Sequence, residues 1–140
     1  MPILVIQHAD RCRPGRLGRT LRDHACRLKI VRPDQGDALP TDLDDIDGVI
    51  SLGGPQNVGE RHAWIPREIE LLRAAHERAL PVIGVCLGHQ LLAAALGGEV
   101  GPMDAPEIGF PTLTILPAGH TDTILGGIAW ASPQFQHHKQ

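Results

Sequence analysis

The chain has 140 residues, enough for one domain of average size with its own hydrophobic core. Its formal net charge is −3 and 42% of its residues are hydrophobic, a composition typical of soluble globular proteins. No apolar run is as long as a membrane span, and Met1 is followed by no basic leader. We therefore expect a cytoplasmic protein that does not bind membranes.

Cysteines and charges exclude further classes of function. Cys12, Cys26 and Cys86 are odd in number and lack metal-ligand spacing, so neither a disulfide framework nor a metal site is indicated. Eight of the 13 Lys and Arg residues lie in residues 11–32. Such a basic segment either meets an acidic partner or a phosphorylated substrate, or is the solvated side of a helix. Because aromatic residues make up only 3% of the chain, we expect no nucleic-acid binding.

Hydrophobic periodicity predicts alternating strands and helices in the first eighty residues. Strands are predicted at residues 3–6, 28–31 and 47–52, with an acidic loop and one helical turn at 34–45. A helix after Pro14-Gly15 and a helix at 64–79 are each predicted to have one apolar side. These sides consist of Leu17, Leu21, Ala25 and Leu28 in the first helix, and Ile65, Ile69, Leu72 and Ala79 in the second.

A short β-branched run at residues 81–85 predicts a buried strand, and residues 87–96 predict a buried helix that stops at Gly97-Gly98. Beyond residue 100 we expect an extended strand at 109–116, a Pro/Gly turn, and short strands at 130–131 and 134–136. Alternating elements of this size imply parallel strands with right-handed crossovers. The predicted fold is an α/β, doubly wound, mainly parallel sheet of flavodoxin-like type, with its site along the carboxyl edge of the strands.

Cys86 lies where the strand at 81–85 turns sharply into the helix at 87–96. Gly84 and Gly88 flank it in a G-x-C-x-G pattern, the cysteine counterpart of the serine nucleophile elbow. The glycines leave space for tightly packed backbone, and the helix amino terminus favours the thiolate, the form that attacks carbonyls. The alternative is a small, inert core residue. The elbow around it favours a catalytic nucleophile.

A cysteine that attacks an amide needs hydrogen-bond donors for the developing oxyanion. The elbow provides the backbone N–H of Leu87, the residue after the nucleophile. Gly53-Gly54-Pro55 follows another predicted strand and is placed to provide a second donor. Because Pro55 has no N–H, the donor is Gly53 or Gly54, and we favour Gly54. The alternative for this segment is an ordinary turn.

Three ordered motifs resemble those of class I (triad-type) glutamine amidotransferase domains, the glutaminase units of GMP synthetase, anthranilate synthase and their relatives. The motifs are Gly84-Val-Cys-Leu-Gly-His-Gln90, the earlier Asp47-Gly-Val-Ile-Ser-Leu-Gly-Gly-Pro55, and the later Glu107-Ile-Gly-Phe110. The resemblance runs from about residue 2 to the end. It implies that residues 1–140 form the amino-terminal portion of such a domain.

The resemblance also implies a function for individual residues. Cys86 would attack the side-chain amide of glutamine, release ammonia and form a γ-glutamyl thioester. Gly54 and Leu87 would form the oxyanion hole, and Gln90 would help hold the substrate. His89 would be a packed helix residue, and the strand at Glu107 would be mainly structural. No cofactor or metal is implied, and a synthetase domain or subunit would receive the ammonia.

The family's catalytic base and its orienting acid lie in a later His-Pro-Glu segment, and no His-x-Glu occurs here. The end of the chain, from Phe135 to His138, instead resembles an earlier family segment in which an aromatic run precedes His-Gly-Asp. His137 or His138 as the base is the weaker alternative, and a metal site at this pair is weaker still because no third ligand is evident. We therefore expect little or no turnover from these 140 residues alone.

Two other functions stay open at this point. One is a γ-glutamyl or cysteine peptidase-like hydrolase that uses the same elbow. The other is a non-catalytic binding or regulatory module that keeps the fold without its dyad. Missing sheet strands would expose an edge, so we also expect the chain to associate with itself or with another protein chain.

Overall fold

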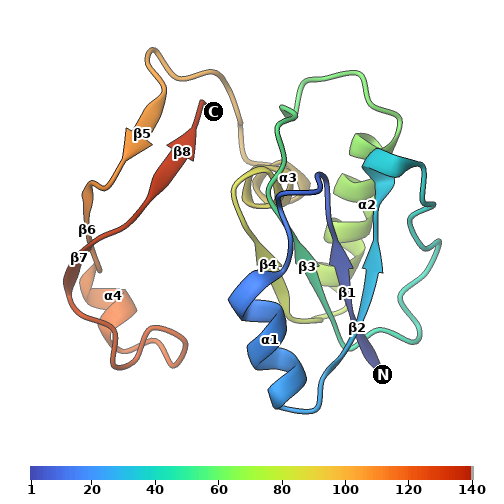
Figure 1. Cartoon of the computed structure of the whole chain (residues 1–140), viewed down its shortest axis with the longest axis horizontal. Coiled ribbons are helices and arrows are strands. Elements are labelled where there is room, and N and C mark those ends of the chain that lie inside the picture. The colour runs from blue at the N-terminus through green and yellow to red at the C-terminus, as the bar shows by residue number, and fades with distance from the viewer. Residues whose placement is uncertain (140) are drawn as a thin grey trace. The chain divides into compact units, whose positions relative to one another are not determined.

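The computed structural model describes residues 1–139, which form two compact units, one of residues 1–101 and one of residues 102–139 (Figure 1). Each unit is described by itself. The first unit contains a four-stranded parallel sheet in the order β2-β1-β3-β4. Its elements are β1 (Pro2–Ile6), α1 (Gly15–Asp23), β2 (Arg27–Val31), the 3-10 helix η1 (Pro33–Gln35), β3 (Gly48–Ser51), α2 (Trp64–Glu77), β4 (Val82–Gly84) and α3 (Leu87–Ala95).

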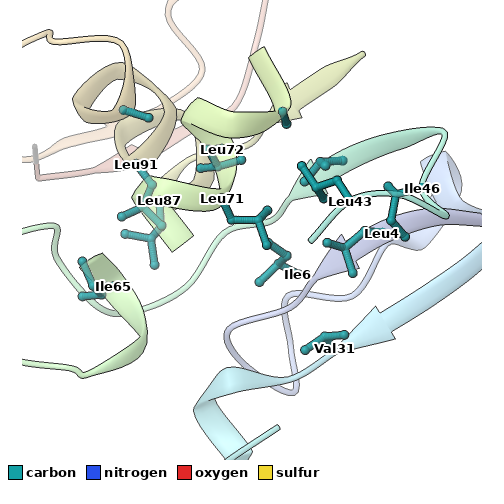
Figure 2. Close-up of a cluster of buried hydrophobic side chains, with 13 residues drawn as sticks. Leu4, Ile6, Val31, Leu43, Ile46, Ile65, Leu71, Leu72, Leu87 and Leu91 are labelled. Atoms are coloured by element: carbon teal, nitrogen blue, oxygen red, sulfur yellow. The ribbon is translucent and has the colours of Figure 1, made fainter. Parts of the chain in front are cut away.

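Helices cover both faces of this sheet. Because successive strand residues point to opposite faces, Leu4 and Ile6 of β1 join a buried cluster with α2 and α3, as Figure 2 shows. Val5 points the other way and lies in a second cluster, against which Leu17 and Leu21 of α1 pack. The doubly wound α/β fold predicted from the sequence is confirmed, and the carboxyl ends of its parallel strands share one edge.

Both amphipathic helices end earlier than their hydrophobic pattern predicts. Ala25 and Ala79 have φ of 60° and 55°, the left-handed conformation that terminates a helix. The N–H groups that follow them turn back to helix carbonyls, Cys26 to Leu21 at 2.9 Å and Leu80 to Ala75 at 3.0 Å. Placing Ala25, Ala79 and Leu28 on apolar helix sides was therefore wrong: the alanines terminate the helices and Leu28 belongs to β2.

Strand β4, which leads to Cys86, is the last strand in the sheet order and not a buried one. Ile83 is 46% exposed and Val85 is 44% exposed, so the prediction of a buried strand was wrong. The apolar, β-branched composition indicated a strand correctly. It could not indicate whether a neighbour covers that strand.

The second unit contains two antiparallel strand pairs. β5 (Glu107–Gly109) pairs with β8 (Gln136–His138), and β6 (Thr112–Thr114) pairs with β7 (Ala131–Pro133). The predicted continuous strand at 109–116 is broken, because Gly109 has a φ of 142° and Pro111 has no N–H for a ladder. The predicted Pro/Gly turn is the short helix α4 (Pro117–His120). Among the described residues, no helix is long and apolar enough to cross a membrane.

Candidate active site

Cys86 occupies the turn between β4 and α3, as the G-x-C-x-G pattern predicts. It is the N-cap residue of α3, with φ 52° and ψ −113°. A non-glycine residue in this region stores about 1–3 kcal/mol of backbone strain. The residue is exposed, as a cysteine that meets a substrate must be. An exposed thiol in a strained strand-to-helix turn is the geometry of a nucleophile elbow.

The two flanking glycines are required by close backbone packing. A Cβ on Gly88 would collide with the carbonyl and hydroxyl groups of Ser51. A Cβ on Gly84 would lie 2.7 Å from the Gly88 carbonyl oxygen and from the His89 nitrogen. A side chain at either position would displace the backbone that packs around Cys86.

The loop after β3 lies directly beside the elbow. The Cβ position of Gly53 is 3.4 Å from Cys86 Cβ, and that of Gly54 is 3.0 Å from Leu87 Cδ2. Leu87 is the first residue of α3, so its N–H belongs to the first-turn donors that lack an intrahelical acceptor. The structure therefore brings the segments of both expected oxyanion donors, Gly54 and Leu87, next to Cys86.

Gln90 lies one turn along α3, half-buried, and its N–H donates to the Cys86 carbonyl at 3.0 Å. Its expected contact with the substrate stays a prediction. His89 is exposed, so the expectation of a packed helix residue was wrong. Only the apolar positions of the helix, such as Leu87 and Leu91, point into the core.

Sequence reasoning missed a buried polar network beneath the elbow. His8, Ser51 and Glu68 are each 0% exposed. Glu68 Oε1 accepts a hydrogen bond from Ser51 Oγ at 2.6 Å, and Glu68 Oε2 lies 2.8 Å from His8 Nε2. The ring of His8 also stacks on Trp64 at a centroid distance of 4.9 Å. The signal available in the sequence for this network was the presence of polar residues, His8 and Ser51, at the carboxyl ends of β1 and β3.

Cys12 lies close to the elbow. Its Sγ lies 3.9 Å from the Cβ position of Gly53, the same point that Cys86 Cβ approaches. Burial, and then the charge of Cys86, raise the pKa of the Cys12 thiol. Cys12 is thus a neighbour of Cys86 with a lower tendency to ionise than an ordinary cysteine.

His138, the weaker candidate for the base, lies on β8 in the second unit. Its Nε2 is 2.8 Å from Glu107 Oε2, across the β5-β8 pair. This contact between the two side chains explains their position without catalysis, and the role of His138 stays a prediction. Within residues 1–139, no group of three or more His, Cys, Asp or Glu side chains is arranged to hold a metal ion.

The basic segment forms an exposed surface on and around α1, where Arg16, Arg19 and Arg22 are all exposed. Arg32 is paired with Asp10 and Asp34, and its hydrogen bond lowers the pKa of the Asp10 carboxyl. A separate open cavity of about 480 Å³ lies between the loop at 39–43 and α2, lined by Leu39, Leu43, Arg67, Glu70 and Arg78 among others. The elbow residues do not line it.

Comparison with known proteins agrees with this geometry. The family model for "Glutamine amidotransferase class-I" matches residues 15–125, which include the elbow and the glycine loop. The chain belongs to the class-I glutamine amidotransferase family. It is 37% identical over 103 residues to a GMP synthase (glutamine-hydrolyzing) of Aeropyrum pernix, covering 74% of this chain and 19% of the relative. It is 32% identical over 121 residues to a GMP synthase (glutamine-hydrolyzing) subunit of Natronomonas pharaonis, covering 81% and 56%.

Solved structures share the fold. A glutamine amido transferase from Methylobacillus flagellatus has a TM-score of 0.89 and 32% identity, with 99% of this chain and 55% of that chain covered. The structure of SMU.1228c has a TM-score of 0.90 and 26% identity, covering 99% and 62%. The chain therefore spans little more than half the length of these proteins.

Proposed function

We propose that this chain provides the nucleophile and the oxyanion hole of a glutamine-hydrolysing site. Cys86 Sγ attacks the side-chain amide carbon of glutamine, and the N–H groups of Gly54 and Leu87 stabilise the oxyanion. Breaking the C–N bond, with the proton of the Cys86 thiol passing to the leaving nitrogen, releases ammonia and leaves a γ-glutamyl thioester, which water hydrolyses to glutamate. Gln90 helps hold the substrate. The observation that carries this proposal is the exposed Cys86 at φ 52° between two glycines that admit no side chain.

Hydrolysis of the thioester needs a general base for water. His8 is a poor candidate, because it is fully buried and both of its ring nitrogens have hydrogen-bond partners inside the protein. His138 stays the weaker alternative described above. We therefore propose that these 140 residues acylate far more readily than they turn over.

The curated relatives compared above are a GMP synthase and a GMP synthase subunit, both named as glutamine-hydrolyzing. On that basis we propose that the ammonia passes to a synthetase domain or to a separate synthetase chain. The cytoplasmic setting and association into homo-oligomers stay predictions from the sequence. A concentration-independent monomer on size-exclusion chromatography would contradict the latter.

Competition against a glutamine-derived diazoketone tests the substrate class. This reagent resembles glutamine, binds in its place and alkylates a thiolate held next to the bound side chain. We expect free glutamine to slow alkylation of Cys86, and asparagine, one methylene shorter, to have little effect. Stronger protection by γ-glutamyl dipeptides than by glutamine would favour the peptidase-like hydrolase instead. Failure of every competitor would contradict a glutamine site.

A further inference from the structure

Three fully buried polar side chains meet beneath the nucleophile elbow, on three different elements. Glu68 comes from α2, Ser51 from the end of β3, and His8 from just beyond β1. Ser51 donates its hydroxyl to one carboxylate oxygen of Glu68, and His8 Nε2 meets the other. His8 Nδ1 lies 2.9 Å from the Leu52 carbonyl oxygen. Every hydrogen-bonding atom of the three side chains thus has a partner.

The hydrogen-bond partners determine how many protons this network holds. A carbonyl oxygen only accepts, so His8 Nδ1 must carry a proton and donate it to Leu52. A single further proton is then shared between His8 Nε2 and Glu68 Oε2. The pair is either imidazolium with carboxylate or imidazole with carboxylic acid, and its net charge is zero in both forms. A neutral pair avoids the large penalty for an isolated buried charge.

A core polar network of this kind is a poor way to gain stability, because well-packed apolar side chains of similar volume are often equally stable or more so. Its position suggests another use. The Leu52 carbonyl accepts from His8 and also from the Gly88 N–H of α3, at 3.1 Å. The Ser51 carbonyl accepts from the Val85 N–H at 2.9 Å. Gly88 also packs directly against Ser51.

The same network borders the glycine loop. A Cβ on Gly54 would lie 2.7 Å from His8 Cβ, so the histidine packs directly against this loop. Gln56 Nε2 donates to the His8 carbonyl at 3.2 Å, which ties the end of the loop to the same residue. His8 therefore contacts the segment of the proposed oxyanion donor, while Ser51 supports the first turn of α3.

We propose that Ser51, Glu68 and His8 are positioning residues for Cys86, whose hydrogen bonds hold the Ser51 and Leu52 backbone under the elbow and the His8 side chain against the glycine loop. The proposal rests on the nucleophile role proposed for Cys86. None of the three side chains touches the substrate, since all are fully buried. Their effect reaches the reaction through the placement of Cys86 and of its oxyanion donors.

Replacing Glu68 tests the proposal. In Glu68→Ala, Ser51 and His8 lose their shared hydrogen-bond partner, so these hydrogen bonds no longer hold the backbone under the elbow. The maximal alkylation rate of Cys86 by the glutamine-derived diazoketone should fall about tenfold or more, because small misplacements of reacting groups cost up to about a hundredfold. The reagent concentration at half-maximal rate should change less than the rate. Unchanged maximal rates would overturn the proposal.

The Glu68→Gln variant separates hydrogen bonding from charge. Its amide oxygen accepts from Ser51 and its amide N–H donates to neutral His8, so the network stays satisfied without a carboxylate. We expect this variant to alkylate much closer to the wild-type rate than Glu68→Ala does. If Glu68→Gln is as slow as Glu68→Ala, the hydrogen-bond account is wrong.

Two control variants separate positioning from general loss of stability. Ile46→Ala removes a buried side chain just before β3, at the edge of the sheet opposite Cys86. Glu70→Ala removes an exposed carboxylate from the same helix as Glu68. Both should alkylate at the wild-type rate. A slowing in Ile46→Ala equal to that in Glu68→Ala would overturn the proposal.

Amide hydrogen exchange gives a readout that does not depend on glutamine. The Gly88 and Gln90 N–H groups lie in the turn that Ser51 and Leu52 support. Their exchange should accelerate in Glu68→Ala and stay slow in Glu68→Gln and Ile46→Ala. If wild type shows no alkylation of Cys86, the proposed function fails, and exchange at these amides still decides the positioning role. Unchanged exchange in Glu68→Ala would reject it.

Discussion

Cys86 has a positive φ for a different reason from the other two non-glycine residues that share this feature. Ala25 and Ala79 terminate helices, whereas Cys86 begins one at φ 52°. The conformation persists because the neighbouring backbone leaves no alternative, with Gly88 packed on Ser51 and Gly84 on the first turn of α3. At this scale the nucleophile-elbow geometry depends on the absence of two side chains as much as on the presence of one thiol.

Replacing Gly88 with alanine tests this dependence. The new Cβ would occupy the space of the Ser51 carbonyl, so the elbow must shift. We expect Gly88→Ala to lower the free energy of unfolding by about 3 kcal/mol or more, measured by urea denaturation. Gly59→Ala is the matched control: nothing lies within 4 Å of its Cβ position, and it should change stability by under about 0.5 kcal/mol. Equal stability of the two variants would contradict the packing described.

Cys12 and Cys86 should differ in their reaction with iodoacetamide. Burial and the nearby Cys86 raise the pKa of Cys12, so at any given pH a smaller fraction of it is thiolate than in an ordinary cysteine. The alkylation rate of Cys12 should therefore rise only at higher pH than that of free cysteine, as followed by peptide mass spectrometry. The midpoint is the pH at which the alkylation rate of Cys12 reaches half its maximum. In Cys86→Ala this midpoint should be lower, because one cause of the raised pKa of Cys12 is gone. A Cys12 midpoint at or below that of free cysteine would refute this.

At the scale of elements, the apolar face shared by α2 and α3 holds the elbow on the sheet. Leu72 of α2 is fully buried in the cluster that contains Leu87 and Leu91 of α3 (Figure 2). Leu72→Ala should cost about 2–5 kcal/mol of unfolding free energy, the range for a buried leucine that leaves a cavity. Leu96→Ala is the control: at 51% exposed it should cost under about 1 kcal/mol. Similar losses in the two variants would mean that α2 does not pack as described.

Local patterns predicted most of the elements that place Cys86. Strand and helix periods and the glycines are properties of short segments, and the alternating strands and helices that they predicted in the first unit are confirmed. The buried network could not be predicted in the same way. Glu68 lies on the apolar side of α2, between Ile65 and Leu72, but its partners are distant in the sequence: His8 is 60 residues away and Ser51 is 17 residues away. The exposure of β4 likewise depends on a neighbouring strand, which composition does not reveal.

At the scale of the whole molecule, the two units differ in how much side chain they bury. Core residues of β1 and β3 such as Leu4 and Val49 are almost fully buried, whereas no residue in 102–139 is. Large apolar side chains of the second unit, including Phe110, Ile124 and Trp130, are mostly exposed. The second unit should therefore open locally at far lower free energy than the first.

Hydrogen exchange of the intact chain checks this difference. Amides of β1 and β3 should exchange at rates limited by global unfolding, and amides of the β5-β8 and β6-β7 pairs should exchange much faster. The comparison needs no variant, because β1 and β3 are the internal control. Equal protection of the two units would show that the second unit is stabilised by more than its own side chains.

The identity of the reactive cysteine tests the central claim most directly. The chain should be incubated with the glutamine-derived diazoketone, digested, and examined by mass spectrometry, alongside Cys86→Ala, Cys12→Ala and Cys26→Ala. We predict a single adduct on Cys86 in wild type, retained in Cys12→Ala and Cys26→Ala and absent in Cys86→Ala. Equal labelling of wild type and Cys86→Ala would contradict the assignment of Cys86 as the nucleophile.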